Sequence, residues 1–178
     1  MTIDRFAVSQ EGSCLQVGTL RNAAPADVPA IHAMTQIAYA GYRDRLPYSS
    51  LWQETEADVA QELAAGIIVL CETAGQIGGS VRCQVRNDVA ACQPFVYVHR
   101  LAVLPQYQRQ GIGRQLMQAV EAFAQEHQVN WVRLEYRLAQ PENALFYDRL
   151  GYHMGETSRF FADGSPRSRW MFKQISLP

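Results

Sequence analysis

Two glycines separated by one residue mark the stretch of the sequence that is best suited to bind an anion. They are Gly111 and Gly113 in the segment Gln108-Arg109-Gln110-Gly111-Ile112-Gly113, which lies between an apolar run and an amphipathic segment. The first turn of a helix carries backbone N–H groups without intrahelical partners and lies at the positive end of the helix dipole. Glycine leaves these amides open to a phosphate, and Arg109 and Arg114 add positive charge beside them. The pattern indicates a phosphate-binding turn.

A glycine pair of this kind also has a simpler explanation, because glycine lets a helix pack closely against a strand. The segment lacks the third glycine of the dinucleotide-binding fingerprint and the Gly-Lys-Ser/Thr sequence of nucleotide P-loops. On its own, therefore, the pair leaves a phosphate site and a packing role both open.

The neighbouring segments have the composition needed to hold such a turn in place. The run Phe95–Leu104 is rich in Val and apolar on both alternating faces, which predicts a central β-strand, and Pro105 ends it. Regular alternation along this strand would place His99 and Leu101 on the same face. After the glycines, apolar residues recur at helical spacing and predict an amphipathic helix. These residues are Ile112, Leu116, Ala119, Val120 and Phe123.

Two motifs taken together resemble a known enzyme family. The segment Gln108–Gly113 resembles the Gln/Arg-x-x-Gly-x-Gly/Ala signature of the GNAT superfamily of acyl-CoA-dependent N-acetyltransferases. The strand Leu101–Pro105 before it looks like the fourth strand of that family, and Asn143–Tyr152 is similar to its later Asn-x-x-Ala/Phe-Tyr-x-x-x-Gly-Phe/Tyr motif. Two motifs in the right order and at the right separation are far more specific than either one alone. The close match covers about residues 97–152.

The resemblance implies that the protein transfers an acetyl group from acetyl-CoA to a primary amine of a small molecule, peptide or protein. The amine would attack directly in a ternary complex, without an acyl-enzyme. In the family, the diphosphate of CoA lies on the glycine turn and the pantetheine arm pairs with the fourth strand, where a backbone N–H polarises the thioester carbonyl. The cofactor-binding residues implied here are Leu101, Ala102, Val103, Gln108, Arg109, Gln110, Gly111, Ile112, Gly113, Arg114, Asn143, Phe146 and Tyr147.

The same resemblance assigns the two proton transfers of the reaction. Tyr147 matches the general-acid tyrosine of the family, and a phenol with a reference pKa of ~10 is protonated and able to donate to the leaving thiolate. His99 lies where the family often carries a glutamate base, and a histidine with a reference pKa of ~6.5 is largely neutral near pH 7 and can accept the amine proton. A packed strand histidine would explain His99 equally well, and Glu135 on the adjoining strand is the alternative base.

The order of the remaining elements predicts an α+β fold. The resemblance implies a GNAT-like three-layer arrangement, with helices on both faces of a mostly antiparallel mixed sheet of about seven strands and a splayed parallel pair at its fourth and fifth strands. Residues 1–12 are expected to form a loose tail, followed by a single acyltransferase domain over residues 13–178. Further strands are predicted at 15–20, 67–72, 77–85, 131–136, 152–161 and 169–174. Helices are predicted to start at Ala23–Asp27, at Thr55 and at Pro141, and residues 86–92 are predicted to form a polar connection.

The composition of the chain limits its partners and its environment. A net charge of −1 over 178 residues gives no electrostatic reason to expect nucleic acid, and no apolar run reaches the ~18 residues needed to cross a membrane. The four cysteines form no Cys-x-x-Cys pair and no histidine cluster has metal-ligand spacing, so no metal is expected. Scattered free cysteines favour a reducing compartment, and we expect a cytoplasmic monomer or homodimer.

The amine acceptor is left open by the sequence. In the family, the acceptor site is shaped by the first helix pair and by the last hairpin, and the corresponding segments here are Tyr39–Trp52 and Arg159–Arg169. Both segments mix aromatic residues with charges of either sign, so they show no acidic trough for a polyamine. The alternative function is a non-catalytic acyl-CoA-binding sensor or interaction domain on the same fold, which would keep the glycine turn and could dispense with Tyr147 and a base.

Overall fold

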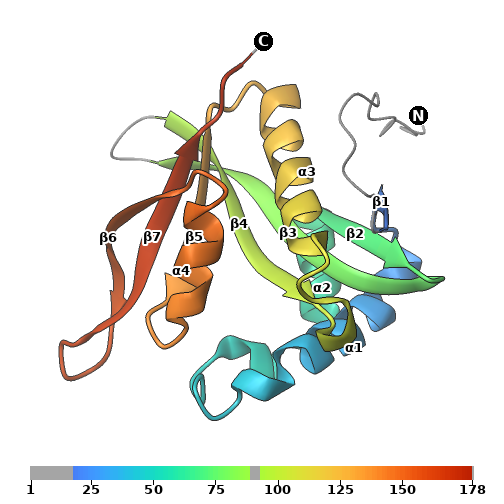
Figure 1. Cartoon of the computed structure of the whole chain (residues 1–178), viewed down its shortest axis with the longest axis horizontal. Coiled ribbons are helices and arrows are strands. Elements are labelled where there is room, and N and C mark those ends of the chain that lie inside the picture. Colours follow the sequence, from blue (N-terminus) through green and yellow to red (C-terminus); the bar gives the residue numbers. More distant parts are fainter. Residues whose placement is uncertain (1–17, 89–92, 178) are drawn as a thin grey trace.

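In the computed structural model, which describes residues 18–88 and 93–177, the chain forms one mixed sheet flanked by helices (Figure 1). Within these residues seven strands lie in the order β1-β2-β3-β4-β5-β7-β6, and β4 and β5 are the parallel pair among antiparallel neighbours. The strands are β1 (Thr19–Asn22), β2 (Ile67–Thr73), β3 (Gln76–Asp88), β4 (Gln93–Val103), β5 (Trp131–Arg137), β6 (His153–Phe160) and β7 (Pro166–Gln174). The helices are α1 (Val28–Tyr39), α2 (Glu56–Ala65), α3 (Ile112–Glu126) and α4 (Pro141–Asp148). The predicted α+β class and mixed sheet are confirmed.

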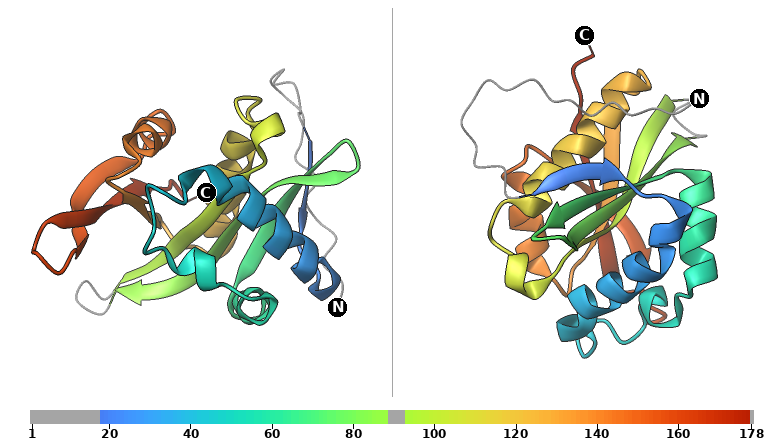
Figure 2. Two further views of the ribbon diagram at one scale, coloured as in Figure 1. Left: turned by 90° about the horizontal axis from the view of Figure 1, so that it is seen from below. Right: turned by 90° about the vertical axis from the view of Figure 1, so that its right-hand side faces the viewer.

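The helices cover the sheet from both sides and give the three expected layers (Figure 2). Helices α3 and α4 lie on one face, and α1 and α2 lie on the other. The main hydrophobic core lies between the sheet and α3, and all five residues of the predicted helical stripe are buried in it. Two smaller clusters join α1 and α2 to β2, and α1 to the end of β4. In the described residues, these two clusters contain no residue of β5, β6 or β7, so α1 and α2 pack on the other half of the sheet.

Local sequence features set where the helices around the site begin. Thr55 Oγ1 accepts a hydrogen bond from the Asp58 amide at 3.3 Å, and Asp58 Oδ2 accepts one from the Thr55 amide at 2.8 Å. These two bonds form a capping box, which starts α2 directly after Thr55, where the sequence predicts a helix. Pro141 is the first residue of α4, where its missing N–H costs nothing, as predicted.

The parallel strands β4 and β5 pair over a short stretch and then separate. Their register ends at Val98 opposite Leu134, although β4 continues to Val103 and β5 to Arg137. The predicted splayed pair is therefore confirmed, and the strands diverge beside α4 (Figure 1). The divergence leaves one edge of β4 open to groups other than β5.

A bulge in β4 changes which side chains face each layer. The register against β3 shifts between Ser80 and Arg82, so that Arg100 and Leu101 of β4 stand opposite one residue of β3. Arg100 has a φ of 52°, a left-handed conformation that residues other than glycine rarely adopt. The alternation therefore changes phase at Arg100, and the prediction that His99 and Leu101 share a face is wrong. Leu101 packs in the core beside α3, whereas His99 pairs with α2 on the opposite face.

The hairpin of β3 and β4 is longer than the sequence predicts. The polar segment 86–92 is predicted to connect the strands, but Arg86–Asp88 continue β3 and pair with Gln93–Phe95 of β4. Because Val85, Arg86 and Asn87 are exposed, polar residues here belong to a paired arm in solvent rather than to a loop.

Smaller differences concern the ends of the outer strands. Strand β1 begins at Thr19, and the predicted residues 15–17 lie outside the described residues, as do the expected tail at 1–12 and two of the four cysteines, Cys14 and Cys92. Strand β7 begins at Pro166 rather than Arg169. Proline can open a strand because its missing N–H is lost at the end of a ladder.

Candidate active site

A small cavity lies where β4 separates from β5. Its volume is about 70 Å³, and its walls come from the end of α1, the end of β4 and the start of α4. The lining residues are Ala38, Tyr39, Tyr42, Leu101, Ala102, Val103, Gln108, Gln140 and Asn143. Five of the predicted cofactor-binding residues, Leu101–Val103, Gln108 and Asn143, therefore surround one cavity.

The edge of β4 that faces this cavity makes hydrogen bonds to side chains instead of to β5. The Leu104 amide donates a hydrogen bond to the carbonyl of Gly78 on β3. Because the backbone groups of successive residues in a strand point to alternate sides, those of Leu101 and Val103 point away from β3. The Leu101 carbonyl accepts a hydrogen bond from the Tyr39 hydroxyl at 2.8 Å, and the Val103 carbonyl accepts one from Gln108 Nε2 at 3.0 Å. Polar backbone groups are thus presented along one wall of the cavity.

Gln140 is a cavity residue that the sequence analysis missed. It is 3% exposed, its Oε1 accepts a hydrogen bond from Asn143 Nδ2 at 3.3 Å, and its Nε2 has no partner among the described residues. A buried amide N–H without a partner is costly, so this group is ready to donate to a ligand. The sequence signal was weak, because a polar residue before Pro141 at the start of α4 is common at helix N-caps.

The two glycines of the predicted anion-binding turn have different roles. Gly111 is the N-cap of α3 with a φ of 93°, and a Cβ added there would meet no atom within 4 Å. The first amide to donate back along α3 is that of Gln115, to the Gly111 carbonyl at 3.0 Å, so the amides before it have no intrahelical partner. A Cβ on Gly113 would lie 3.2 Å from the ring of Phe146. Gly113 therefore lets α4 pack against α3, while Gly111 leaves the approach to the free amides open.

The other predicted cofactor-binding residues lie around this turn. Arg109, Gln110 and Arg114 are exposed, and Gln110 Nε2 donates to the Gln106 carbonyl at 2.9 Å. Ile112 is 1% exposed because its side chain belongs to the main core, so only its backbone could contact a ligand.

Tyr147 lies on α4 in a group of aromatic rings. Its ring centroid is 5.0 Å from that of Phe146 and 5.9 Å from that of Tyr152, and it packs against the main core. Burial raises the pKa of the Tyr147 phenol, and the nearby Tyr39 raises it further. The phenol therefore stays protonated at neutral pH and is suited to donate a proton.

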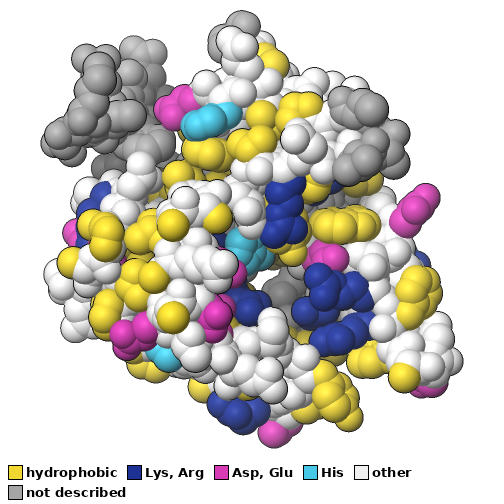
Figure 3. Space-filling model, turned by 180° about the vertical axis from the view of Figure 1, so that it is seen from behind, with side chains coloured by type: hydrophobic (Ala, Val, Ile, Leu, Met, Phe, Trp, Pro, Cys, Tyr) yellow, Lys and Arg dark blue, Asp and Glu magenta, His cyan; other side chains and the backbone are white. Residues whose placement is uncertain are grey.

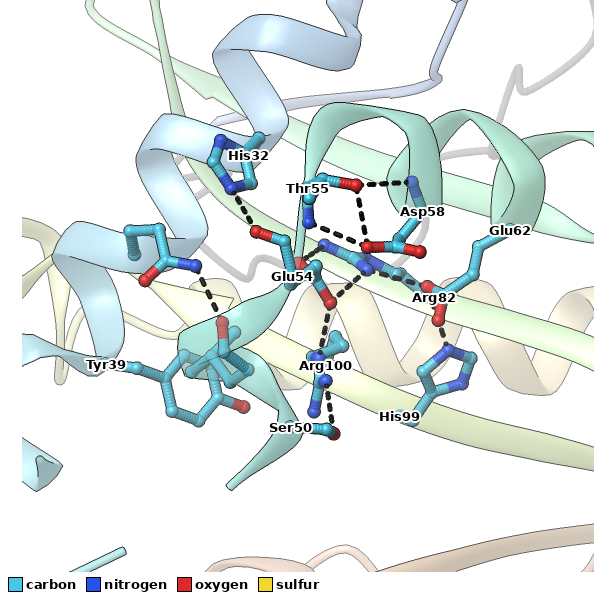
Figure 4. Close-up of polar contacts among 12 residues, drawn as sticks. His32, Tyr39, Ser50, Glu54, Thr55, Asp58, Glu62, Arg82, His99 and Arg100 are labelled. Carbon is cyan, nitrogen blue, oxygen red and sulfur yellow. Dashed lines mark hydrogen bonds and ion pairs between the residues drawn. The ribbon is translucent and has the colours of Figure 1, made fainter. Parts of the chain in front are cut away.

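His99 is held by a carboxylate from α2 (Figure 4). Its Nε2 lies 3.1 Å from Glu62 Oε2, and Glu62 also accepts a hydrogen bond from Arg82 Nη1 at 2.6 Å. Burial opposes ionisation of Glu62, but His99 and Arg82 outweigh it and lower the pKa of that carboxyl to about 2. An ionised carboxylate can only accept, so Nε2 carries the hydrogen. Nδ1, which is buried and has no partner among the described residues, then holds the lone pair of the neutral ring.

Glu62 belongs to a buried charge network that the sequence analysis missed. The Arg82 side chain is 1% exposed, and its Nη1 and Nη2 donate to the two oxygens of Glu54 at 3.0 and 2.8 Å. Arg100 Nε donates to Glu54 Oε1 at 3.0 Å. The network of Glu54, Glu62, Arg82, His99 and Arg100 joins α2, the segment before it, β3 and β4 (Figure 4). One signal was available, since Arg82 lies between Val81 and Cys83 in a predicted strand, and an arginine among apolar neighbours needs a charged partner when it is buried.

Glu135 lies on the same face of the sheet as His99 but is already paired. Its neighbours Leu134 and Tyr136 pack in the core with α3, so Glu135 points to the opposite face. It accepts hydrogen bonds from Arg159 Nε at 3.0 and 3.3 Å, and its side chain is 10% exposed. On this face, a hollow is bordered by Lys and Arg side chains (Figure 3).

A second, larger cavity lies between the segment after α1, the end of β5 and the last hairpin. Its volume is about 350 Å³, within the usual size range of small-molecule sites. Its lining residues are Asp44, Arg45, Leu46, Pro47, Tyr48, Ser49, Arg137, Leu138, Ala139, Phe161, Pro166 and Arg167. The two segments implied as acceptor-binding, Tyr39–Trp52 and Arg159–Arg169, both contribute to these walls.

The described residues offer no metal site and no membrane span. Within them, no group of three or more His, Cys, Asp or Glu side chains could hold a metal ion. None of the helices in the described part of the chain is long and apolar enough to cross a membrane.

Comparison with solved structures identifies the class of fold. The structure is similar to the ribosomal-protein-S18-alanine N-acetyltransferase from Escherichia coli, with a TM-score of 0.70, 22% identity, and coverage of 90% of this chain and 96% of that chain. It is also similar to Ard1 from Thermoplasma volcanium (TM-score 0.65, 22% identity, 90% and 99% coverage). A third similar structure is a probable acetyltransferase from Staphylococcus epidermidis (TM-score 0.72, 11% identity, 89% and 99% coverage). The fold is that of the GNAT N-acetyltransferases.

The sequence itself identifies the family. Residues 31–152 match the family model described as the acetyltransferase (GNAT) family, which is more than half of the chain. The chain belongs to the acetyltransferase (GNAT) family, and the predicted resemblance is confirmed. No curated protein matches the sequence.

Replacing Glu54 by Gln should destabilise the protein by about 3 kcal/mol. The buried guanidinium of Arg82 would then pair with Glu62 alone, and Arg100 would lose its ion pair with Glu54. Urea unfolding at neutral pH would measure the change in the free energy of unfolding. Glu126→Gln is the matched control, since Glu126 is exposed on α3, and it should change that free energy by less than about 0.5 kcal/mol. Equal losses in both variants would contradict the structural role of the network.

Proposed function

We propose that the protein transfers an acetyl group from acetyl-CoA to a primary amine by direct attack in a ternary complex. The observation that carries this proposal is the cavity at the divergence of β4 and β5, where backbone carbonyls of β4 meet the amide side chains of Gln140 and Asn143. Membership of the acetyltransferase family supports the acetyl transfer.

The N-terminus of α3 is the proposed site for the diphosphate of acetyl-CoA. The amides of Ile112, Gly113 and Arg114 precede the first intrahelical donor, and Gly111 leaves the approach to them open. Arg109 and Arg114, both exposed, would pair with phosphate oxygens. The positive end of the α3 dipole adds to this attraction.

The pantetheine arm would pass along the outward edge of β4. Its amides can replace Tyr39 and Gln108 as partners of the Leu101 and Val103 carbonyls. The unpartnered Nε2 of Gln140 would donate to an oxygen of the arm. In this position, backbone N–H groups on the same edge of β4 would stabilise the negative charge that develops on the thioester oxygen.

The reaction needs one group to accept a proton and another to donate one. The neutral amine nitrogen attacks the thioester carbonyl carbon, the C–N bond forms, and the C–S bond then breaks. The amine proton passes to a base, directly or through a water molecule. Tyr147 donates its phenolic proton to the thiolate sulfur, and its raised pKa keeps it protonated until that step.

His99 is the favoured base, because its Nδ1 has no hydrogen-bond partner among the described residues, while the carboxylate of Glu135 is engaged by Arg159. Glu62 is a positioning residue in this scheme: it fixes the hydrogen on Nε2 and stabilises the imidazolium that forms. Glu135 is the second candidate for the base, since it lies on the same face of the sheet as His99.

Gly111→Asp should weaken acetyl-CoA binding at least about tenfold relative to Gly111→Asn, which corresponds to about 1.4 kcal/mol. The two side chains have nearly the same size and both tolerate the left-handed conformation of residue 111, so their difference isolates the repulsion between a carboxylate and the diphosphate. Isothermal titration calorimetry would measure both dissociation constants. Equal affinities would place the diphosphate elsewhere.

Tyr147→Phe should lower kcat by about 100-fold while leaving the dissociation constant of acetyl-CoA within about twofold, because only the proton donor is lost. Tyr136→Phe, which removes a hydroxyl from a buried tyrosine of β5, is the matched control and should keep kcat. Unchanged turnover in Tyr147→Phe would remove the acid role. Binding of acetyl-CoA by the wild-type protein, without turnover of any amine, would favour the non-catalytic sensor.

The pH dependence of kcat/KM for the amine should separate the two candidate bases. His99→Gln should abolish the acidic limb of the profile, because the amide that replaces the imidazole cannot accept the amine proton. Glu135→Gln should leave the shape of the profile intact. The reverse pattern, with the limb lost in Glu135→Gln and kept in His99→Gln, would assign the base to Glu135.

A further inference from the structure

The larger cavity combines apolar walls with a cluster of arginines. Its volume of about 350 Å³ is enough for an apolar group of amino-acid size. Tyr48 is 76% exposed and Phe161 is 43% exposed, so both present ring surface to incoming molecules. The apolar part of the lining consists of Leu46, Pro47, Tyr48, Leu138, Ala139, Phe161 and Pro166.

The arginines around this cavity are not equally neutralised. Arg45 pairs with Glu142 at 2.8 Å, and Arg159, which lies nearby on β6, pairs with Glu135. Arg137 and Arg167, which line the cavity, have no carboxylate partner among the described residues. Arg167 Nη2 donates to the Tyr48 carbonyl at 3.0 Å, and its guanidinium lies 5.6 Å from the centre of the Phe161 ring.

Arg137 carries the clearest sign of uncompensated charge. Its Nη1 is buried and has no hydrogen-bond partner among the described residues. Burial lowers the pKa of this guanidinium, repulsion from Arg167 and Arg159 lowers it further, and attraction to Glu135 offsets only part of this effect. A buried N–H of a charged group without a hydrogen-bond partner is costly, so a bound anion that accepts from Nη1 would stabilise this corner of the cavity.

The cavity adjoins the proposed reaction site at two points of the chain. Tyr42 lines the smaller cavity and Asp44 lines the larger one, two residues further along. In the same way, Ala139 belongs to the larger cavity and Gln140 to the smaller one. A molecule in the larger cavity can therefore direct an amine towards the opening between β4 and β5.

We propose that the amine acceptor carries a carboxylate, which binds to Arg137 and Arg167, and an apolar body, which lies against the walls of this cavity. This inference rests on the proposed acetyl transfer. Asp44, the acidic residue of the lining, offsets part of the charge of these two arginines, and Arg45 is balanced by Glu142. The remaining positive charge matches one carboxylate. A free apolar or aromatic α-amino acid has this combination of groups.

A panel of matched amines tests the proposal with acetyl-CoA and detection of the released thiol. The pairs are phenylalanine with phenethylamine, tyrosine with tyramine, and leucine with isopentylamine; phenylalaninamide keeps the α-amine and its substituent but lacks the charge. The amino acids should show a kcat/KM about 10- to 100-fold higher than their uncharged partners, the range expected for charge-assisted hydrogen bonds. Equal or higher values for the uncharged amines or the amide would overturn the proposal and leave the acetyl transfer intact.

Variants of the two arginines provide the second arm. Arg137→Gln and Arg167→Gln should each lower kcat/KM for phenylalanine by about 10- to 100-fold and change that for phenethylamine by less than about twofold. Arg149→Gln, an exposed residue after α4, is the matched control and should change neither. Acetyl-CoA binding and the melting temperature report whether each variant is folded. Arg167 serves as the second test because its guanidinium donates to the Tyr48 carbonyl and lies over the Phe161 ring, so its loss breaks no ion pair among the described residues.

The outcomes separate this inference from the function on which it rests. Equal losses for phenylalanine and phenethylamine in folded variants would overturn the carboxylate role of the arginines. Acetyl-CoA binding without turnover of any amine in the panel would overturn both this inference and the proposed acetyl transfer to a small amine.

Discussion

The burial of one arginine constrains the whole reactive half of this protein. Arg82 is almost fully enclosed between the sheet and α2, and a charge in that position is tolerated only because Glu54 and Glu62 accept from it. Glu54 also holds Arg100 at the bulge of β4, and Glu62 also holds His99. The segment between α1 and α2, which lines both cavities, is thereby tied to the two central strands. The charged groups that stabilise the layer thus also fix the geometry of the site.

The bulge explains which parts of the fold could be predicted and which could not. Features encoded within one element were predictable: the buried stripe of α3, the capping box at Thr55 and the glycine turn. The phase change at Arg100 was not, because Leu101 and Ala102, which follow it and face opposite sides of the sheet, are both apolar, so the sequence fits either phase. The partners of Arg82 lie 28 and 20 residues away in sequence, so no local pattern indicates them.

The two cavities share their supporting contacts. Arg45 Nε donates to the Ala139 carbonyl at 3.0 Å and its guanidinium pairs with Glu142, which ties the segment after α1 to the start of α4. Tyr39, at the end of α1, reaches the Leu101 carbonyl on the edge of β4. Displacement of Tyr39 by a ligand on β4 would therefore act on the same segment that forms a wall of the larger cavity.

The position of Glu62 also determines what a change of pH can do to the site. Both oxygens of Glu54 accept hydrogen bonds from Arg82, whereas Glu62 lies within hydrogen-bonding distance of the imidazole of His99. Because the pKa of Glu62 is lowered from 4.5 to about 2, its contribution to stability is fully present above pH 4.5 and is lost as the pH falls towards 2. Arginines keep their charge throughout this range. Near neutral pH, therefore, Arg82 and Glu62 both keep their charges, and their ion pair holds the carboxylate in place beside His99.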